Sequence, residues 1–431
     1  MTDNRTRRKA SANPDSDAPA IRRVTAKWDN HCSVSLGIYI SVPFCKTKCT
    51  YCNFASDVFS KAVFQKYVDR VCNDIESAQI SCQRLGGRFE REVDSIYLGG
   101  GTPTILEIGE IERLFAAVSQ NFHKAPGAEI TVECAPGTLT SAMLDALQAC
   151  GVNRVSLGVQ SFIDEEAKAI GRLHRRETVL ADIENLRAAG ISDISIDLIA
   201  GLPHQTTKSW GESLDHVIAS GVPHVSVYML EVDEDSRLGR ELIAGGTRYH
   251  AHLVPDEDLT AELYESAGER LEEAGLPQYE ISNFARPGSR SRHNLKYWTR
   301  QPYLGFGVDA HSMLEAIDPE LDAVRFATPD SLEKYVAGEA LARTPVTPQN
   351  ALEETFFLGL RLCDGVDLAE VSSKFGENAV AGLGPTLMEL QSLGLVVQRE
   401  NRIQLTRQGR LLSNEVFERF LNFEALQRAA L

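Results

Sequence analysis

Three cysteines stand within eight residues of one another near the start of the chain, in the segment GIYISVPFCKTKCTYCNF (37–54). Cys45, Cys49 and Cys52 have the spacing C-x3-C-x2-C and follow a short apolar run, 38–42, that reads as a β-strand. A loop of this length brings three thiolates to one centre, and thiolates select zinc or iron–sulfur clusters. Because a [4Fe–4S] cube normally takes four cysteines, three would leave one iron open to an outside ligand.

Zinc is the alternative for this loop, since three sulfurs and a histidine complete a tetrahedral site. No histidine follows Cys52 at ligand spacing, and His31 lies well upstream in a polar segment. The sequence therefore favours a cluster over a structural zinc ion. The total of nine cysteines is odd and three of them are clustered, which is unlike a disulfide framework and fits a reducing compartment.

The composition is that of a globular chain with more than one domain. With 431 residues the chain exceeds one ordinary hydrophobic core. No apolar run approaches the roughly 18 residues of a membrane span, and the N-terminus has no signal-peptide core. The net charge of −16 argues against general binding to nucleic acid or anionic lipid. We expect a cytoplasmic protein, with no nucleic-acid partner, whose contact with a membrane would be peripheral.

Residues 1–34 differ from the rest of the chain. Seven basic and four acidic residues stand here among asparagines and prolines, with few large apolar side chains. Such a segment cannot bury enough apolar surface to fold, so it is predicted to be a disordered polar tail. Its aspartates argue against a transit peptide.

Strand-like and helical stretches alternate from residue 35 onward. The strand-like runs are 38–42, 93–98, 129–134, 154–160, 192–199 and 223–230. Amphipathic stretches separate them at 59–85, 107–121, 140–150, 164–189 and 206–220. Six β/α repeats with connections of this length predict parallel strands joined by crossover helices. The predicted fold class is therefore α/β, with a partial (β/α)6 barrel of the TIM type over 35–230.

Several of these strands carry polar residues at every second position, which is unusual for parallel strands buried on both faces. In three of them this pattern ends on Glu133, Gln160 and Asp197. A period of two places these side chains on one face near the carboxyl ends of their strands, where barrel active sites gather. One such residue would be an ordinary satisfied buried group. Three in register favour a polar, ligand-binding cavity.

Three consecutive glycines, 99–101, end the second strand and are followed by Thr102. Without a Cβ atom, the backbone here can be approached closely by the charged end of a ligand. A glycine run alone could be a tight turn. Its place after a strand, beside the cysteine loop, indicates a ligand contact.

The cysteine loop, the glycine run and the segment DLIAGLP (197–203) together resemble the radical S-adenosylmethionine (SAM) superfamily. From about residue 37 to the C-terminus the chain is similar to its coproporphyrinogen dehydrogenase-like branch, and most of all to the haem chaperone family HemW. The resemblance implies a [4Fe–4S] cluster with SAM on the open iron. An electron delivered to that cluster would then cleave SAM to methionine and a 5′-deoxyadenosyl radical. Residue by residue, it assigns the SAM contacts to Tyr39, Gly100, Gly101, Thr102, Glu133, Gln160, Arg172 and Asp197.

An extension of the barrel is expected over 231–344, with a helix at 259–275. Within it, SRHNLKYW (291–298) is dense in aromatic residues, which can stack on a flat conjugated ligand, and histidine is a common axial haem ligand. An interfacial aromatic cluster is the plainer alternative. The pattern H-N-x-x-Y-W resembles a motif that the HemW family associates with haem. It makes candidate haem-binding residues of His293, Asn294, Tyr297 and Trp298, with His311 as a second candidate ligand.

The last segment, 345–431, has helical patterning at 351–363 and 379–393, a hairpin from 395 to 405 and a further helix at 407–422. Helices followed by such a hairpin predict a winged-helix-like α+β domain. DNA binding is not expected, because eight basic residues stand against eleven acidic ones and DNA contact needs a basic face. A lid or docking domain fits better.

The resemblance implies that the protein binds haem and delivers it to acceptor haemoproteins, such as those of respiration, with a flavodoxin or ferredoxin as electron donor and with a homodimer as one possible state. The first alternative is an oxygen-independent coproporphyrinogen III dehydrogenase, which decarboxylates propionates by radical chemistry. Such enzymes carry a further cysteine two residues after the third, where this chain has Phe54. Their folded N-terminal extension also has no counterpart in the polar tail. A radical SAM enzyme acting on another tetrapyrrole is the second alternative.

Overall fold

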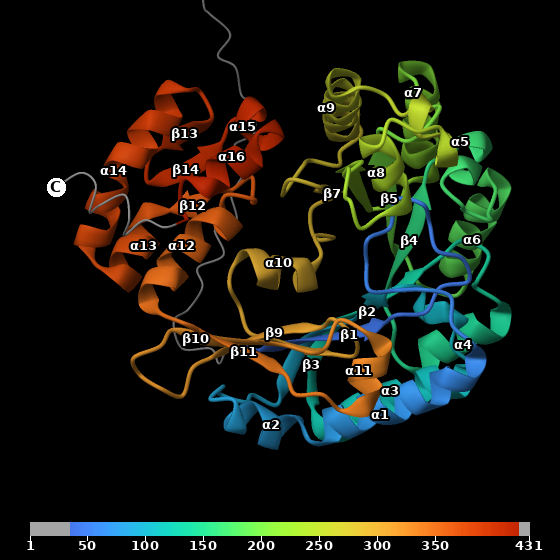
Figure 1. Ribbon diagram of the computed structural model, residues 1–431, viewed down its shortest axis with the longest axis horizontal. Helices are drawn as coiled ribbons and strands as arrows, with labels where there is room; N and C mark the ends of the chain where they lie inside the picture. The colour runs from blue at the N-terminus through green and yellow to red at the C-terminus, as the bar shows by residue number, and fades with distance from the viewer. Residues whose placement is uncertain (1–34, 422–431) are drawn as a thin grey trace, which may run out of the picture. The chain divides into compact units, whose positions relative to one another are not determined.

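The computed structural model describes residues 35–421. The predicted tail, 1–34, and the end of the predicted C-terminal helix, from 422 on, lie outside this range. Figure 1 shows a curved sheet with helices against its convex side, and a second, mostly helical module made by the C-terminal residues.

All six strands predicted from the sequence are present and parallel. They are β1 (Leu36–Val42), β2 (Glu92–Gly100), β3 (His123–Cys134), β4 (Arg154–Gln160), β5 (Asp193–Ala200) and β6 (His224–Met229). They lie side by side in chain order, as crossover connections of one hand require. The predicted partial (β/α)6 barrel is therefore confirmed.

The crossovers are helical, as expected, but two of them are interrupted. The elements are η1 (Lys61–Val63), α1 (Phe64–Glu76), α2 (Ala78–Arg84), η2 (Pro103–Ile105), α3 (Ile108–Asn121), α4 (Ser141–Ala149), α5 (Asp164–Ala169), α6 (Arg176–Ala188) and α7 (Thr207–Ser220). The stretch 59–85 breaks at Ser77. The stretch 164–189 breaks at Gly171, whose φ of 87° is left-handed. There the Ile170 carbonyl accepts a hydrogen bond from the Thr50 amide, so the break lets this segment reach the cysteine loop.

The residues after β6 extend the same sheet at both edges, giving the order β11-β10-β9-β8-β1-β2-β3-β4-β5-β6-β7. The added strands are β7 (Asn283–Ala285), β8 (Tyr303–Phe306), β9 (His311–Glu315), β10 (Ala323–Ala327) and β11 (Ala342–Val346). The added helices are α8 (Arg237–Ile243), η3 (Arg248–Leu253), α9 (Glu257–Glu273), α10 (Arg292–Trp298) and α11 (Leu332–Ala337). Of these, only α9 was predicted. The boundary expected after residue 344 falls inside β11.

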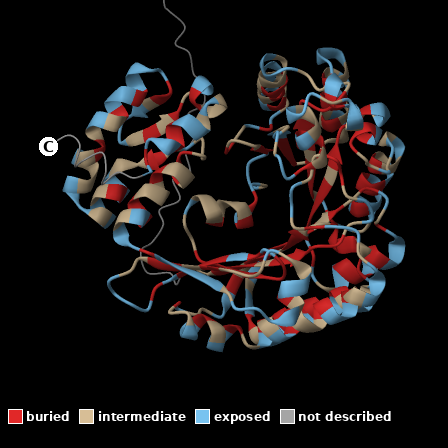
Figure 2. Ribbon diagram, in the orientation of Figure 1, coloured by how far each residue is buried: buried red, intermediate tan, exposed pale blue. Residues whose placement is uncertain are grey.

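The two faces of the barrel strands differ as their alternation predicts. Apolar side chains such as Ile194, Ile196 and Leu198 are fully buried and share the main core with residues of the covering helices. The opposite face carries polar side chains that are also buried, namely Ser95, Thr131, Arg154, Ser156, Ser195, His224 and Ser226. Figure 2 shows these strands as mostly buried. The barrel interior is therefore polar, and α10 lies within the hollow of the sheet in Figure 1.

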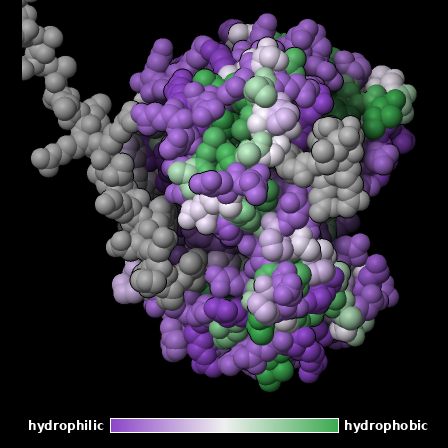
Figure 3. Space-filling model, turned by 90° about the vertical axis from the view of Figure 1, so that its left-hand side faces the viewer, coloured by the Kyte–Doolittle hydropathy of each residue, from purple (hydrophilic) through white to green (hydrophobic). Residues whose placement is uncertain are grey.

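The C-terminal residues form a module with an apolar core of its own. Its elements are α12 (Pro348–Gly359), β12 (Val366–Asp367), α13 (Leu368–Phe375), α14 (Glu377–Ser392), β13 (Val396–Arg399), β14 (Arg402–Leu405), α15 (Arg407–Leu411) and α16 (Ser413–Glu418). The predicted hairpin is present as β13 and β14, which pair with β12 in a three-stranded sheet. Helices followed by this hairpin give the winged-helix-like arrangement expected. In Figure 3, hydrophilic residues cover most of the side on which this module lies.

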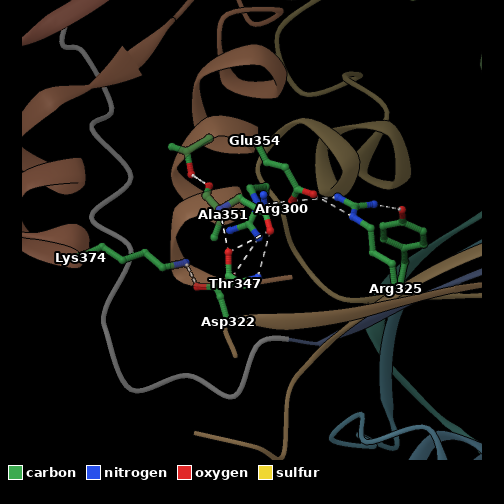
Figure 4. A network of polar contacts seen from close by, with 10 residues as sticks. Arg300, Asp322, Arg325, Thr347, Ala351, Glu354 and Lys374 are labelled. Carbon is green, nitrogen blue, oxygen red and sulfur yellow. Dashed lines mark hydrogen bonds and ion pairs between the residues drawn. The ribbon is translucent and has the colours of Figure 1, made fainter. Parts of the chain in front are cut away.

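An ion-pair network joins this module to the extended sheet (Figure 4). Glu354 of α12 accepts hydrogen bonds from Arg300, after α10, and from Arg325 of β10, at 2.8 to 3.0 Å. Arg300 also pairs with Asp322 at 2.9 Å, and Lys374 of α13 pairs with the same aspartate at 3.0 Å. The Arg300 side chain is only 6% exposed, so its charge depends on these partners.

Candidate cluster and cofactor site

The cysteine loop leaves β1 at Pro43 and is held by backbone hydrogen bonds on both sides. The Cys45 amide donates to the Asp57 carbonyl at 3.0 Å, and the Cys52 amide donates to the Cys49 carbonyl at 3.3 Å. The Thr50 amide donates to Ile170, which ties the loop to the turn after α5. The three cysteines therefore lie at the mouth of the barrel, beside the carboxyl ends of its strands.

The surroundings of the thiols suit a cluster ligated as thiolates. The Arg172 guanidinium lies 3.6 Å from the Cys49 sulfur, and the Thr102 hydroxyl lies 4.0 Å from the Cys45 sulfur. Burial raises the pKa of Cys45, and the neighbouring cysteines raise it further. A fixed cation and a hydroxyl donor are what three crowded thiolates need beside them. The donor set thus fits an iron–sulfur cluster.

One pocket at the barrel mouth, here called the mouth pocket, brings together the three cysteines and nearly all the predicted SAM contacts. The site residues predicted from the sequence that line this pocket are Cys45, Cys49, Cys52, Gly100, Gly101, Thr102, Glu133, Gln160, Arg172 and Asp197. Tyr39 does not line it. Its hydroxyl lies 3.3 Å from where a Cβ atom on Gly100 would stand, just behind the glycine run.

Two of the glycines are required by this geometry. Gly100 has a φ of 97°, which disfavours any side chain. A Cβ atom on Gly101 would stand 2.6 Å from the Phe44 carbonyl oxygen, because the glycine run packs directly against the start of the cysteine loop. The glycine run therefore both closes the turn and keeps the mouth pocket open to a ligand.

Glu133 and Asp197 are partly buried carboxyls facing the mouth pocket. The Tyr97 hydroxyl donates to Glu133 Oε1 at 2.7 Å, and the Gly100 amide donates to Oε2 at 3.1 Å. Burial raises the pKa of Glu133 to about 7 in spite of these donors. Burial likewise raises the pKa of Asp197, although Ser156 donates to both of its carboxylate oxygens. These partly buried carboxyls are therefore placed to gain from a positively charged ligand.

Sequence reasoning missed Tyr97 and Ser156, which hold these carboxyls. Tyr97 lies opposite Thr131 of β3, and Ser156 lies opposite Glu133, so the period of two that points Glu133 inward places both on the same face once the strand register is known. Gln160 follows a register shift in β4 and has a φ of 69°. Its left-handed backbone turns it into the mouth pocket at the end of the strand.

His293 lies deep in the barrel, with 1% of its surface exposed. Its Nδ1 is 3.0 Å from the Ser95 hydroxyl and its Nε2 is 2.8 Å from the Tyr297 hydroxyl. An axial ligand offers a free ring nitrogen to iron, and here both nitrogens are occupied. The geometry therefore gives no support to His293 as a haem ligand, and a haem titration remains the test of that prediction. His311, by contrast, has a side chain that is 67% exposed.

The four residues of the predicted haem motif are placed differently relative to a second pocket. Trp298, at the end of α10, lines this pocket with Arg300 and the C-terminal module, here called the module pocket. His293, Asn294 and Tyr297 are not among its lining residues. Glu129 of β3 explains the separation. Its carboxylate accepts from the backbone amides of Arg292 and His293, at 2.9 and 3.1 Å, and fixes the start of α10 inside the barrel.

Comparison with known proteins agrees with this arrangement. The model of the radical SAM superfamily matches residues 39–217, and that of the HemN C-terminal domain matches residues 346–412. The chain is 35% identical to the haem chaperone HemW of Bacillus subtilis over 392 residues, which are 89% of this chain and 98% of that one. This protein belongs to the HemW family.

Other relatives support the same family. HemW of Escherichia coli is 30% identical over 90% of this chain and 98% of its own length. A bovine mitochondrial protein named radical S-adenosyl methionine domain-containing protein 1 is 32% identical over 82% of this chain and 76% of its own. Among solved structures, coproporphyrinogen III oxidase (HemN) of Escherichia coli, described as a radical SAM enzyme, has a TM-score of 0.76 at 25% identity, over 90% of each chain.

Membership of the radical SAM superfamily implies a [4Fe–4S] cluster and SAM as the cofactors of this HemW-family chain, and the mouth pocket fits both. The cysteines would hold the cluster, and the glycine run with Glu133 and Asp197 would hold SAM. When bound, the cluster supplies an electron for SAM cleavage. Within residues 35–421, no helix is long and apolar enough to cross a membrane.

The raised pKa of Glu133 predicts that the affinity for SAM depends on pH. Its carboxyl is neutral below about pH 7 and ionised above it, and a cationic ligand favours the ionised form. SAM affinity, measured by equilibrium dialysis with reconstituted, unreduced protein, should therefore fall about ten-fold between pH 8 and pH 6. Glu133→Gln should bind more weakly at pH 8 and lose most of this dependence. A variant that keeps the full wild-type pH profile would contradict the assignment.

Proposed function

We propose that this chain is a haem chaperone, which binds haem in the module pocket and delivers it to acceptor haemoproteins. The proposal is supported by its kinship to proteins named haem chaperone HemW over nearly their full length. The observation that carries it is the separation of two pockets in one chain. The mouth pocket and the module pocket have no lining residue in common.

The module pocket has the chemistry of a tetrapyrrole site. Trp298 and Phe375 offer aromatic surface to a flat macrocycle. The Trp298 indole nitrogen is buried and, among residues 35–421, has no hydrogen-bond partner, which leaves one unsatisfied donor on a residue of the pocket wall. Lys374 and Arg402 stand in partly exposed ion pairs with Asp322 and Asp367. Such pairs are weak enough for a propionate to replace the aspartate.

The location of the module pocket favours a chaperone over a decarboxylase. A coproporphyrinogen dehydrogenase must bring each propionate to the radical formed from SAM, and therefore into the mouth pocket. A tetrapyrrole bound against Trp298 would instead lie in a pocket that shares no lining residue with the mouth pocket. A macrocycle held there would be kept apart from the radical site and would stay intact for transfer.

The remaining parts of the proposal concern partners and location. A cytoplasmic flavodoxin or ferredoxin would reduce the cluster, and respiratory haemoproteins would accept haem through peripheral contact at the membrane. A homodimer is compatible with this scheme. The acceptor is expected to approach the module pocket, because its lining includes partly exposed side chains such as Lys374 and Arg402.

Transfer and catalysis can be distinguished with the same reconstituted preparation. Haem-loaded protein mixed with an apo-cytochrome of the respiratory chain should lose its haem spectrum as the cytochrome gains one. Reduced protein given SAM and coproporphyrinogen III should form no divinyl product. Formation of that product at one equivalent per protein or more would refute the chaperone proposal in favour of the decarboxylase.

The module pocket makes a prediction for haemin binding. Trp298→Ala should raise the dissociation constant of haemin about ten-fold, since loss of an aromatic stacking partner costs roughly 1–3 kcal/mol. His293→Ala should leave the position of the Soret band unchanged, because neither ring nitrogen is available to iron. Trp210 of α7, which is buried and donates to the Leu263 carbonyl, gives a control in Trp210→Phe. A shifted Soret band in His293→Ala would restore His293 as a ligand.

A further inference from the structure

Helix α10 connects the two pockets. Its C-terminal residue Trp298 and the following Arg300 line the module pocket. Near its N-terminus, His293 lies against two tyrosines that stand behind the wall of the mouth pocket. A single short helix therefore contacts the surroundings of both proposed ligands.

On the side of the mouth pocket, the contacts run through Tyr97. Its hydroxyl donates to Glu133, which itself lines that pocket. Its ring stacks on the imidazole of His293, with centroids 5.4 Å apart and planes inclined by 29°. The Tyr39 ring completes the group, at 6.1 Å from Tyr97 and 6.3 Å from His293. Movement of Glu133 towards a ligand must therefore move Tyr97 against His293.

The orientation of the His293 ring is in turn linked to the last turn of α10. Its two hydrogen bonds, to Ser95 and to Tyr297, fix the plane of the ring between β2 and the last turn of the helix. Burial lowers the pKa of His293 to about 3, so the ring is neutral and both bonds persist over the working pH range. The imidazole cannot turn without breaking both bonds.

On the side of the module pocket, Tyr297 packs edge-on against Trp298 and Tyr303, with centroids 6.4 and 4.6 Å apart. The Tyr303 hydroxyl accepts a hydrogen bond from Arg325 at 3.2 Å, and Arg325 pairs with Glu354 of the C-terminal module. The orientation of Tyr297 thus affects both the aromatic wall of the module pocket and the network that holds the module.

We propose that His293 is a positioning residue that couples the two pockets, so that SAM in the mouth pocket tightens binding of haemin in the module pocket. The inference rests on the proposed function. A ligand at Glu133 restricts Tyr97, His293 and Tyr297, and a second ligand at Trp298 then loses less conformational freedom on binding. The coupling must be reciprocal, so haemin tightens SAM by the same factor.

The barrel contains a matched control for His293. His224 of β6 has partners of the same residue types, a serine and a tyrosine. Its Nδ1 lies 2.7 Å from the Ser195 hydroxyl and its Nε2 lies 3.0 Å from the Tyr279 hydroxyl. It is equally buried, at 1%. Its imidazole ring packs edge-on against the ring of Tyr279, with centroids 5.7 Å apart, and no stacking of this ring on Tyr39 or Tyr97 is found within residues 35–421. Replacing it disturbs the barrel interior and, through Tyr279, which accepts from the Ser291 amide at 3.2 Å, the start of α10, but it leaves the contacts from Glu133 to Trp298 complete.

The experiment measures haemin affinity of the full-length, cluster-reconstituted protein with and without saturating SAM, in the absence of reductant. In the wild type, SAM should lower the dissociation constant of haemin about five-fold or more, the lower end of typical coupling. The factor should fall below about two in His293→Asn and in the milder Tyr297→Phe. It should stay at the wild-type value in His224→Asn. SAM affinity with and without haemin should give the same factors.

The possible outcomes distinguish failure of the coupling between the pockets from failure of the haem-chaperone proposal. Haemin that binds the wild type with equal affinity with and without SAM refutes the coupling and leaves the chaperone intact. Haemin that does not bind at all refutes the chaperone. Coupling that survives in Tyr297→Phe, a variant that only loses a hydroxyl, refutes the path through His293. Equal loss of coupling in His224→Asn refutes it as well, because general loosening of the barrel would then suffice.

Discussion

Anaerobically reconstituted Cys49→Ala is expected to contain no cluster. Cys49 is only 8% exposed at the mouth of the barrel, and its sulfur lies beside the Arg172 guanidinium. With three protein ligands and one open iron, loss of any one leaves a site that cannot hold the cube. The variant should lose its visible absorbance, nearly all bound iron and acid-labile sulfide, and with them tight binding of SAM.

Cys72→Ala is the control for this loss. Cys72 has the same 8% exposure, but it lies in α1, where its thiol meets the Arg113 carbonyl at 3.8 Å. Removing one buried sulfur there costs stability on the order of 1 kcal/mol and leaves the cluster intact. Equal loss of iron in both variants would refute the assignment. Wild-type material holding one zinc ion and no sulfide would refute the cluster and the cofactor together.

The barrel and its polar interior could be predicted from the sequence because both depend on local periodicity. Each strand of the barrel is long enough for a period of two to show, and the crossovers are long enough to form helices. Glu133 and Asp197 reach the mouth pocket for that reason alone. Arg172 was assigned only by resemblance, since a lone arginine after a helix carries no sign that it turns back towards Cys49.

Of the added strands, β7 and β8 were missed because they are too short to show a pattern. β7 has 3 residues and β8 has 4, and each is placed by pairing with a barrel strand far away in sequence. The breaks in the two crossover helices were also missed, because they depend on tertiary contacts. At Gly171 the reason is contact with the cysteine loop, which no local propensity encodes.

The position of α10 could not be predicted either, and this changes the interpretation of its residues. Aromatic density in a polar segment suggested one surface for a flat ligand. In the structure, Glu129 draws the start of the helix into the barrel, so His293 and Trp298 face different surroundings. Neither Glu129 nor its contact, 164 residues away in sequence, has a signal that could be seen without the fold.

Glu354→Ala is expected to cause the largest loss of stability among the changes considered. The carboxylate of Glu354 is bound by two guanidiniums and is only 13% exposed. Its removal leaves Arg300 buried with Asp322 as the remaining partner among residues 35–421. Breaking a buried pair costs roughly 3–5 kcal/mol when one charge is left without a partner, and because Arg300 keeps Asp322, which it shares with Lys374, we expect a loss near the lower end of that range. Urea denaturation followed by tryptophan fluorescence should show this loss, and haemin affinity should fall with it, since Arg300 lines the module pocket.

The same network predicts a response to acid, and an exposed pair supplies the comparison. Burial alone would raise the pKa of Glu354, but Arg325 and Arg300 together hold it below its ordinary value, so the stability it contributes is present above the ordinary pKa and is lost as the pH falls through the lowered one. Glu389, in contrast, pairs with Arg419 while both side chains are about half exposed. Glu389→Ala should therefore cost no more than about 1 kcal/mol. If the two variants lose equal stability, the module is held by its apolar contacts, and the ion pairs of Figure 4 do not fix the position of Trp298 and Arg300 beside it.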